Sequence, residues 1–209
     1  MINDFGLYLI LTDPVAGYTT CTEAAVRCGV RFVQLRIKGY SRRVVLETAR
    51  ALREITWGSD TLFIVNDDVT IAAEATADGV HLGQTDLPLD RARAFWREPG
   101  KIYGLSTHNE AQAAAACALT PDYIGVGPVW PTPTKEIPDP ALGTELAGKI
   151  IHESPLTTVA IGGIDATNLR QVRAAGAANF AVTRAVCQSP APENAIRHLQ
   201  EIWEEARPD

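Results

Sequence analysis

Three polar side chains share one face of a short apolar segment. Residues 32–38 read Phe-Val-Gln-Leu-Arg-Ile-Lys, and the alternation of a β-strand places Gln34, Arg36 and Lys38 on the same side. Burying two cations without an anionic partner costs several kcal/mol. In a chain with a formal net charge of -6, the segment therefore predicts a local site for an anion, most simply a phosphate.

Acidic residues follow the next two apolar segments. Asn66 and Asp67 come directly after Leu-Phe-Ile-Val, and Asp86 ends the run Val-His-Leu-Gly-Gln-Thr-Asp. Mg²⁺ is often held by one or two carboxylates together with phosphate oxygens of the substrate. Asp and Asn also cap helices and form turns, which is the simpler reading of either residue alone. Beside Arg36 and Lys38, the pattern favours a magnesium site.

Two later segments are further candidates for a binding site. Residues 125–143 contain several glycines and prolines around Thr132, Thr134 and Lys135, as in a loop that covers a site, although a plain surface loop has the same composition. The glycine pair at 162–163 and the Thr183-Arg184 pair follow the last two apolar segments. Glycines let a backbone approach a phosphate, so these two loops predict a second anion site; Gly-Gly is otherwise merely a turn.

Short apolar runs alternate with amphipathic stretches along the whole chain of 209 residues. We expect helices to follow the strands, for example at 41–55 and 111–119. The pattern predicts a single (β/α)₈ TIM barrel over residues 1–209, whose site lies at the carboxyl ends of the strands. An open doubly wound sheet is the alternative, but no G-x-G-x-x-G follows the first strand. The expected strands are 7–11, 32–36, 62–65, 79–82, 101–105, 123–126, 158–161 and 179–182.

Composition excludes several classes of protein. The net negative charge and the absence of a Lys/Arg cluster argue against nucleic-acid binding, and no apolar run is long enough to span a membrane. The four cysteines form no C-x-x-C, so reduced thiols and a cytoplasmic location are expected. The oligomeric state is left open, a homo-oligomer included. His81 lies inside a strand and is interpreted as a hydrogen-bonded barrel residue.

Six motifs, in order, resemble the thiamine-phosphate synthase family over nearly the whole chain. They are Gln34-Leu-Arg-Ile-Lys38, Asn66-Asp67, Asp78-Gly-Val-His-Leu-Gly-Gln-Thr-Asp86, Gly104-Leu-Ser-Thr-His108, Asp122-Tyr-Ile-Gly-Val-Gly-Pro-Val-Trp-Pro-Thr-Pro-Thr-Lys135 and Ile161-Gly-Gly-Ile164. The resemblance implies a transferase that condenses 4-amino-2-methyl-5-hydroxymethylpyrimidine diphosphate with hydroxyethylthiazole phosphate. The implied products are thiamine monophosphate and pyrophosphate, and the implied cofactor is Mg²⁺.

The resemblance also implies a role for each site residue. The pyrimidine diphosphate would be held by Gln34, Leu35, Arg36, Ile37, Lys38 and Asn66, with Asp67 and Asp86 as magnesium ligands. Ser106 and Lys135 would contact the same substrate or the departing pyrophosphate. The thiazole phosphate would be held by Thr132, Pro133, Thr134, Gly163, Thr183 and Arg184. Arg184 stands where the family often has Ser, so it would either bind phosphate through its guanidinium or point away.

The roles imply a dissociative substitution in which Arg36, Lys38, Lys135, Ser106 and the metal stabilise charge on the leaving pyrophosphate. Two alternatives remain. One is an isomerase like the related thiazole tautomerases, in which a His at the position of His108 transfers a proton. The other is a barrel that binds a phosphate ligand without catalysis.

Overall fold

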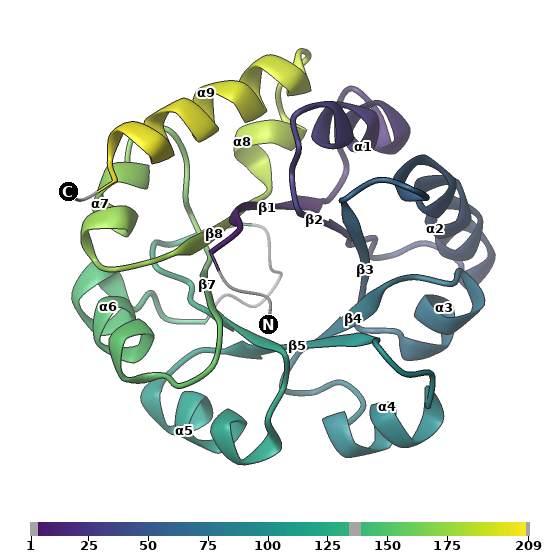
Figure 1. The fold of residues 1–209 in the computed structure, drawn as a ribbon, viewed down its shortest axis with the longest axis horizontal. Coiled ribbons are helices and arrows are strands. Elements are labelled where there is room, and N and C mark those ends of the chain that lie inside the picture. The colour runs from purple at the N-terminus through teal and green to yellow at the C-terminus, as the bar shows by residue number, and fades with distance from the viewer. Residues whose placement is uncertain (1–3, 134–138, 208–209) are drawn as a thin grey trace.

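A computed structural model describes residues 4–133 and 139–207. Within these ranges, eight parallel strands pair in sequence order and close into a barrel, because β8 also pairs with β1 (Figure 1). The predicted (β/α)₈ barrel is therefore confirmed, and the open doubly wound sheet is excluded. The strands are β1 (Gly6–Leu11), β2 (Phe32–Leu35), β3 (Leu62–Asn66), β4 (Gly79–Leu82), β5 (Ile102–Thr107), β6 (Tyr123–Val126), β7 (Thr158–Ala160) and β8 (Asn179–Val182).

Helices surround the barrel as an outer ring (Figure 1). The last of them packs against both α1 and α7, so the end of the described chain closes the ring. No described helix has the length and apolar character that a membrane crossing requires. The helices are α1 (Tyr18–Arg27), α2 (Arg42–Thr56), α3 (Val69–Glu74), α4 (Leu89–Phe95), α5 (Glu110–Leu119), α6 (Gly143–Glu153), α7 (Leu169–Ala174), α8 (Arg184–Cys187) and α9 (Pro192–Glu205).

Capping side chains satisfy the first-turn N–H groups of some of these helices. The Asp68 carboxylate accepts hydrogen bonds from the first-turn N–H groups of α3, and the Asn109 side chain does the same for α5. Ser41 stands at the N-cap of α2, as expected, but its hydroxyl makes no capping hydrogen bond. The position of α2 therefore depends on its buried face, which includes Ala49 and Leu52.

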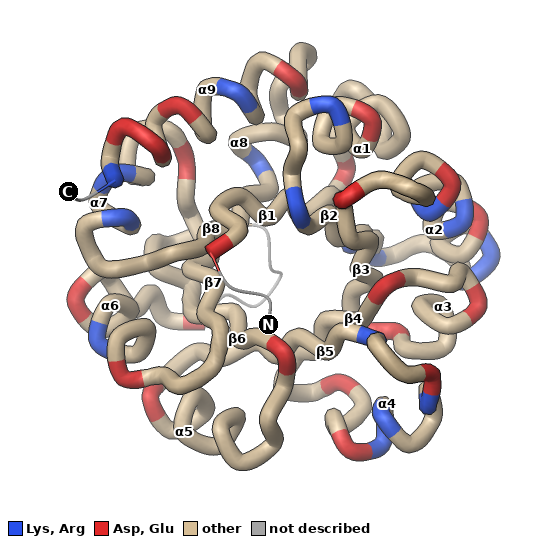
Figure 2. Tube along the Cα trace, in the orientation of Figure 1, with Lys and Arg blue, Asp and Glu red and all other residues tan. Residues whose placement is uncertain are grey.

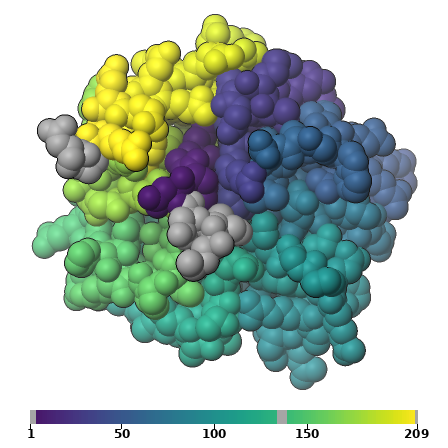
Figure 3. Space-filling view, in the orientation of Figure 1, coloured from purple at the N-terminus to yellow at the C-terminus, as the bar shows by residue number. Residues whose placement is uncertain are grey.

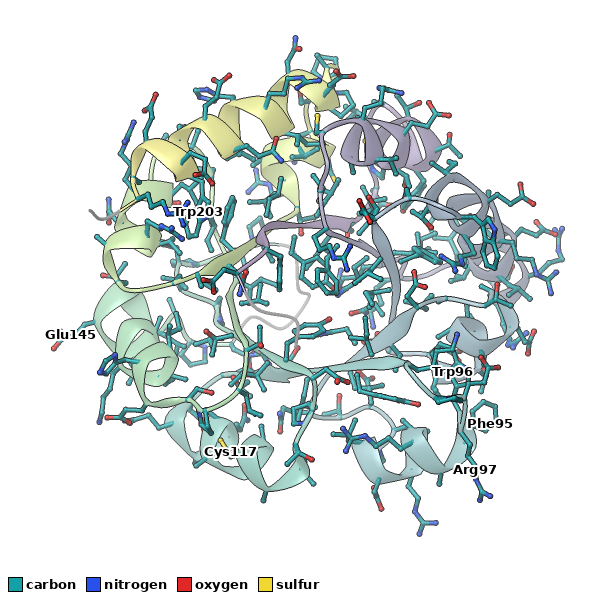
Figure 4. All side chains as sticks on the ribbon, in the orientation of Figure 1. Phe95, Trp96, Arg97, Cys117, Glu145 and Trp203 are labelled. Carbon is teal, nitrogen blue, oxygen red and sulfur yellow. The ribbon has the colours of Figure 1, made fainter. Side chains whose placement is uncertain are left out.

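Strand alternation divides the apolar side chains into two cores. One lies between the barrel and the helices, where Phe180 of β8 packs against Trp203 of α9 with ring centroids 4.4 Å apart; Figure 4 labels Trp203. The other fills the barrel interior. Charged residues lie mainly on the outer ring, and the strands carry few (Figure 2). The interior apolar side chains are Tyr8, Ile10, Phe32, Ile64, Ile102, Tyr123, Val159 and Ala181.

The last helix of the described chain lies beside its first strand. Figure 3 shows the start of the chain, in purple, near the centre of the drawn face, beside the yellow helix α9. A Cβ on Gly6 would lie 3.5 Å from the Trp203 indole nitrogen, an ordinary contact distance. The last helix therefore packs against the first strand of the barrel as well as against α1 and α7.

Gly104 of β5 is an interior position that tolerates no side chain. A Cβ there would overlap the Tyr123 ring and lie 2.5 Å from His81 Nδ1. We expect Gly104→Ala to lower the free energy of unfolding by about 1–3 kcal/mol or more, as overpacked cores do. Urea denaturation measures this, with Gly125→Ala as the matched control, because its Cβ would lie 3.6 Å from His81 in ordinary contact. Equal losses in the two variants would contradict the overpacking explanation.

Candidate active site

A cavity of about 380 Å³ opens at the carboxyl ends of the strands. It lies mainly over β5 to β8 and the loops that follow them. This placement confirms that residues far apart in the sequence converge at one end of the barrel. The predicted site residues that line it are Arg36, Ser106, Thr132, Gly163, Thr183 and Arg184.

A second group of predicted residues lies at the ends of β2, β3 and β4. Lys38 forms an ion pair with the carboxylate of Asp67, and Asp67 lies close enough to Asp86 to raise the pKa of the Asp86 carboxyl. The Asp67 backbone has a φ of 65°, in the left-handed region that residues other than glycine seldom adopt. Its N–H donates to the carbonyl of His81 at 2.7 Å, so the neighbouring strand β4 holds this conformation.

The Asp86 carboxylate is crowded by its surroundings. Burial raises the pKa of Asp86 above the ordinary aspartate value, and the adjacent Asp67 raises it further. The Gly83 N–H, which donates to Asp86 Oδ2 at 2.6 Å, and the Lys38 ammonium lower this pKa in part. Two carboxylates so close together are an environment that favours a cation.

The donor set fits Mg²⁺ better than it fits an ion enclosed wholly by protein. Within residues 4–133 and 139–207, three or more His, Cys, Asp or Glu side chains never gather as a metal site. Mg²⁺ usually keeps water and substrate oxygens and takes one or two carboxylates from the protein. Asp67 and Asp86 supply that number, so these residues fit the expected ion.

The remaining residues of the Gln34–Lys38 segment point in different directions. Leu35 is 1% exposed and packs in the outer core, and Ile37 packs against the same core. Both side chains therefore face the helices, and only their backbone is available to a ligand. Gln34 faces the barrel interior, where its amide Nε2 donates to Tyr8 Oη at 2.8 Å. Asn66 is half-buried at the last position of β3.

The loop after β7 has the geometry of an anion site. Gly162 and Gly163 have φ values of 96° and 65°, and a Cβ on Gly163 would lie 2.7 Å from Trp130 Cβ. Asn168 Nδ2 donates to the Gly163 carbonyl at 2.8 Å and holds the loop. The N–H groups of Gly163 and Ile164 have no acceptor in the described part of the chain. With the nearby Arg184 they make a glycine cradle, an arrangement that could accept a phosphate.

The loop after β6 is described only in part. Thr132 lines the cavity and Pro133 is exposed, whereas Thr134 and Lys135 lie outside the described residues. Trp130 packs against the outer core, and its backbone N–H donates to the Gly162 carbonyl at 3.0 Å. Trp130 therefore braces the glycine loop against the rim of the barrel.

The structure also gives His108 a partner that the sequence did not single out, Asp139. His108 Nδ1 lies 2.6 Å from the Gly127 carbonyl, and His108 Nε2 lies 3.5 Å from Asp139 Oδ2; all three residues line the cavity. Asp139 lies more than thirty positions from His108 in the chain, so no local pattern marks the pair. His81 is a hydrogen-bonded interior residue, as predicted, and its partners include Tyr123 and Ser106.

All four cysteines are free, as expected. Burial raises the pKa of the Cys187 thiol to about 12, which keeps it protonated and unreactive. Cys117 lies on the outer helix α5 (Figure 4). The thiols therefore have no part in the site.

The raised pKa of Asp86 predicts that its charge destabilises the fold. When the pKa of a carboxyl is higher in the folded protein than in the unfolded chain, the protonated carboxyl stabilises the fold. This contribution is fully present below the unfolded pKa and is lost as the pH rises through the folded pKa. We expect Asp86→Asn to be more stable than the parent protein at pH 7, with the gain shrinking below about pH 4, where aspartate protonates in both states. Denaturant melts at the two pH values measure this. Asp60→Asn, at a fully exposed carboxylate, is the control and should show no such gain.

Comparison with known proteins identifies the family of this chain. A family profile described as "Thiamine monophosphate synthase" (TMP-TENI) matches residues 7–186. The thiamine-phosphate synthase of Synechocystis is 43% identical over 198 residues, which are 95% of this chain and 57% of that protein. The enzyme of the same name from Myxococcus xanthus is 38% identical and matched over 97% of this chain and 94% of its own length.

The solved thiamine phosphate pyrophosphorylase of Pyrococcus furiosus superposes with a TM-score of 0.88 at 33% identity, covering 98% of each chain. The present chain spans only a little over half of the Synechocystis protein and of its Gloeobacter violaceus counterpart, 57% and 54% respectively. Profile, sequence relatives and solved structure agree: the chain belongs to the thiamine monophosphate synthase family.

Proposed function

We propose that this protein is a thiamine-phosphate synthase. It condenses 4-amino-2-methyl-5-hydroxymethylpyrimidine diphosphate with hydroxyethylthiazole phosphate and releases pyrophosphate. The observation that carries the proposal is that one end of the barrel holds two differently built groups of residues, each suited to an anion. One has Lys38 beside the carboxylates of Asp67 and Asp86, and the other has the glycine cradle beside Arg184. A reaction between a diphosphate and a monophosphate needs both.

The first site suits a departing diphosphate. Lys38 and Arg36 extend from one strand end, so both cations meet the charge that grows on the leaving group as the C–O bond breaks. Asp67 and Asp86 would hold Mg²⁺, which supplies further neutralisation of that charge when bound. Lys135, predicted to assist there, lies in the segment that is not described.

The second site suits the phosphate of the acceptor. That phosphate does not react, so its binding energy orients the thiazole nitrogen toward the pyrimidine methylene carbon. The backbone N–H groups of Gly163 and Ile164 and the Arg184 side chain are the groups that hold it. Ser106 lines the same cavity, where it would contact the diphosphate substrate or the leaving pyrophosphate.

His108 favours one second candidate, the isomerase. The pair of His108 and Asp139 lines the cavity and has the composition of a proton-transfer pair. An isomerase acting on the thiazole phosphate alone would need neither metal nor the carboxylate pair. The ion pair of Lys38 with Asp67 and the adjacent carboxylate of Asp86 support the synthase instead.

One assay separates these functions. The purified protein is mixed with both substrates and Mg²⁺, with and without EDTA, and thiamine monophosphate is measured by chromatography. We expect product that depends on the free metal. No product at all would overturn the synthase, and equal product under chelation would overturn the metal assignment. Conversion of one thiazole phosphate tautomer into another without the diphosphate would identify the isomerase.

Lys38→Ala tests the leaving-group role. Because the ammonium interacts most strongly with charge that develops during bond breaking, we expect kcat to fall by about 10²–10³ while KM for the diphosphate changes much less. Steady-state kinetics measure both constants. Lys149→Ala, at an exposed lysine paired with Glu110 on the outer ring, is the control and should leave both unchanged. A loss confined to KM would show that Lys38 only binds.

Asp67→Ala tests the metal role. We expect turnover to fall far more than the affinity for thiazole phosphate, which calorimetry measures without catalysis. The same titrations on Asp60→Ala provide the control for loss of a surface charge. If turnover and affinity fall together, Asp67 supports the barrel end as a whole and is not a metal ligand.

A further inference from the structure

A continuous line of hydrogen bonds crosses the barrel interior from β2 to β5. Gln34 Nε2 donates to Tyr8 Oη at 2.8 Å, and Tyr8 Oη lies 2.8 Å from Tyr123 Oη. Tyr123 Oη lies 3.0 Å from His81 Nδ1, and His81 Nε2 lies 2.9 Å from Ser106 Oγ. We call these five residues the interior network. Only its last member, Ser106, lines the cavity.

The chemistry of its first member sets the direction of donation. An amide nitrogen can only donate, so Tyr8 Oη accepts from Gln34. The buried Tyr8 hydroxyl needs an acceptor for its own hydrogen, and Tyr123 Oη at 2.8 Å is the one that its contacts offer, so Tyr8 donates to Tyr123. Tyr123 then donates its own hydrogen bond to His81 Nδ1. Burial raises the pKa of both phenols well above the ordinary tyrosine value, so both keep the hydrogens that this ordering requires.

The direction has a consequence at the cavity. Because His81 Nδ1 accepts a hydrogen bond, the imidazole is neutral and carries its hydrogen on Nε2. That N–H donates to Ser106 Oγ at 2.9 Å. Ser106 therefore accepts from the protein, and its own hydroxyl hydrogen is left for the cavity that it lines.

We propose that His81 and Tyr123 are positioning residues that fix Ser106 as a hydrogen-bond donor toward the substrate. The acceptor that suits such a donor is an anionic oxygen of the diphosphate, and this identification rests on the proposed function. If the hydroxyl is already oriented before the substrate binds, no free energy is needed to reorient it as charge develops on that oxygen. The network thus links a buried residue of β2, Gln34, to the group that meets the leaving diphosphate.

Packing holds the network in one arrangement. The rings of His81 and Tyr123 stack with centroids 5.5 Å apart and an angle of 26° between their planes. Tyr8 and Tyr123 are each 1% exposed, and the missing side chain at Gly104 leaves the space into which Tyr123 and His81 fit. A phenylalanine would fill the place of either tyrosine without its hydroxyl, so packing alone does not require the polar atoms.

The first test is a double-mutant cycle. We expect Tyr123→Phe to lower kcat by about tenfold or more, the usual cost of losing a supporting hydrogen bond behind a reacting group, with KM for thiazole phosphate changed less than twofold. In a Ser106→Ala background, the same substitution should have no further effect on kcat. Tyr103→Phe is the matched control, since its hydroxyl donates a buried 2.7 Å hydrogen bond to the Trp96 carbonyl in the outer core. An undiminished Tyr123→Phe loss in the Ser106→Ala background would overturn the proposal.

A conservative replacement gives the second test. His81→Gln keeps an N–H donor near the place of Nε2, whereas His81→Leu keeps none, so we expect the glutamine variant to retain several-fold more kcat. Equal activity of the two variants would count against positioning through Ser106.

A third test needs no catalysis, so it separates this proposal from the proposed function. Imidazole ¹⁵N chemical shifts of the free protein at pH 7 should report His81 as the neutral ring with its hydrogen on Nε2, and Tyr123→Phe should change that signal. A hydrogen on Nδ1, or a doubly protonated ring, would overturn the proposal even if thiamine monophosphate is formed. Absence of product with the expected tautomer would overturn the proposed function alone.

Discussion

The hydrogen bond between Tyr8 and Tyr123 spans the inside of the barrel, and the site above it depends on that contact. The interior of an eight-stranded barrel is only wide enough to be filled by side chains, which stack in layers. The size of each interior side chain therefore limits the size of its neighbours in the same layer. The two phenol rings fill this layer with Phe32, while their oxygens meet at 2.8 Å. Gly104 must then lack a side chain, and His81 must stack on Tyr123. The layer that packs the barrel therefore also orients the polar groups at its upper end.

The two halves of the candidate site differ in their physical means of holding an anion. The ends of β2 to β4 use full charges, with Lys38 paired to Asp67 and Asp86 beside them. The ends of β7 and β8 offer the backbone N–H groups of Gly163 and Ile164, which carry only partial charge, with the guanidinium of Arg184 nearby. Crowding that raises the pKa of Asp86 is a cost to the fold, and such costs are typical of sites that await a ligand.

Much of this architecture is visible in the sequence, because the features concerned are local. Strand alternation predicts Gln34, Arg36 and Lys38 on one face, but β2 ends at Leu35, so of the three only Gln34 lies in the strand. The closed barrel brings several of the expected strand-end residues to one cavity. The same alternation sends Leu35 into the outer core, although a contiguous motif suggests a binding role for every member. What the sequence does not reveal is non-local. Tyr8 and Tyr123 are 115 positions apart, and His108 meets Asp139 only after the loop folds back. Neither pair leaves a spacing signal, because loop closure and barrel curvature decide which side chains meet.

The route of the interior network has a consequence for how such a barrel could be divided or rearranged. Its members come from β1, β2, β4, β5 and β6, so they are spread over both halves of the barrel. A fragment that ended between β2 and β6 would bury phenol, amide or imidazole groups without partners, at a cost that a half-barrel of this size could not offset. Circular permutation, by contrast, would keep all five residues within one closed barrel and merely move the chain ends to another surface loop. The fold should therefore tolerate circular permutation better than division into two half-barrels that are encoded as separate chains.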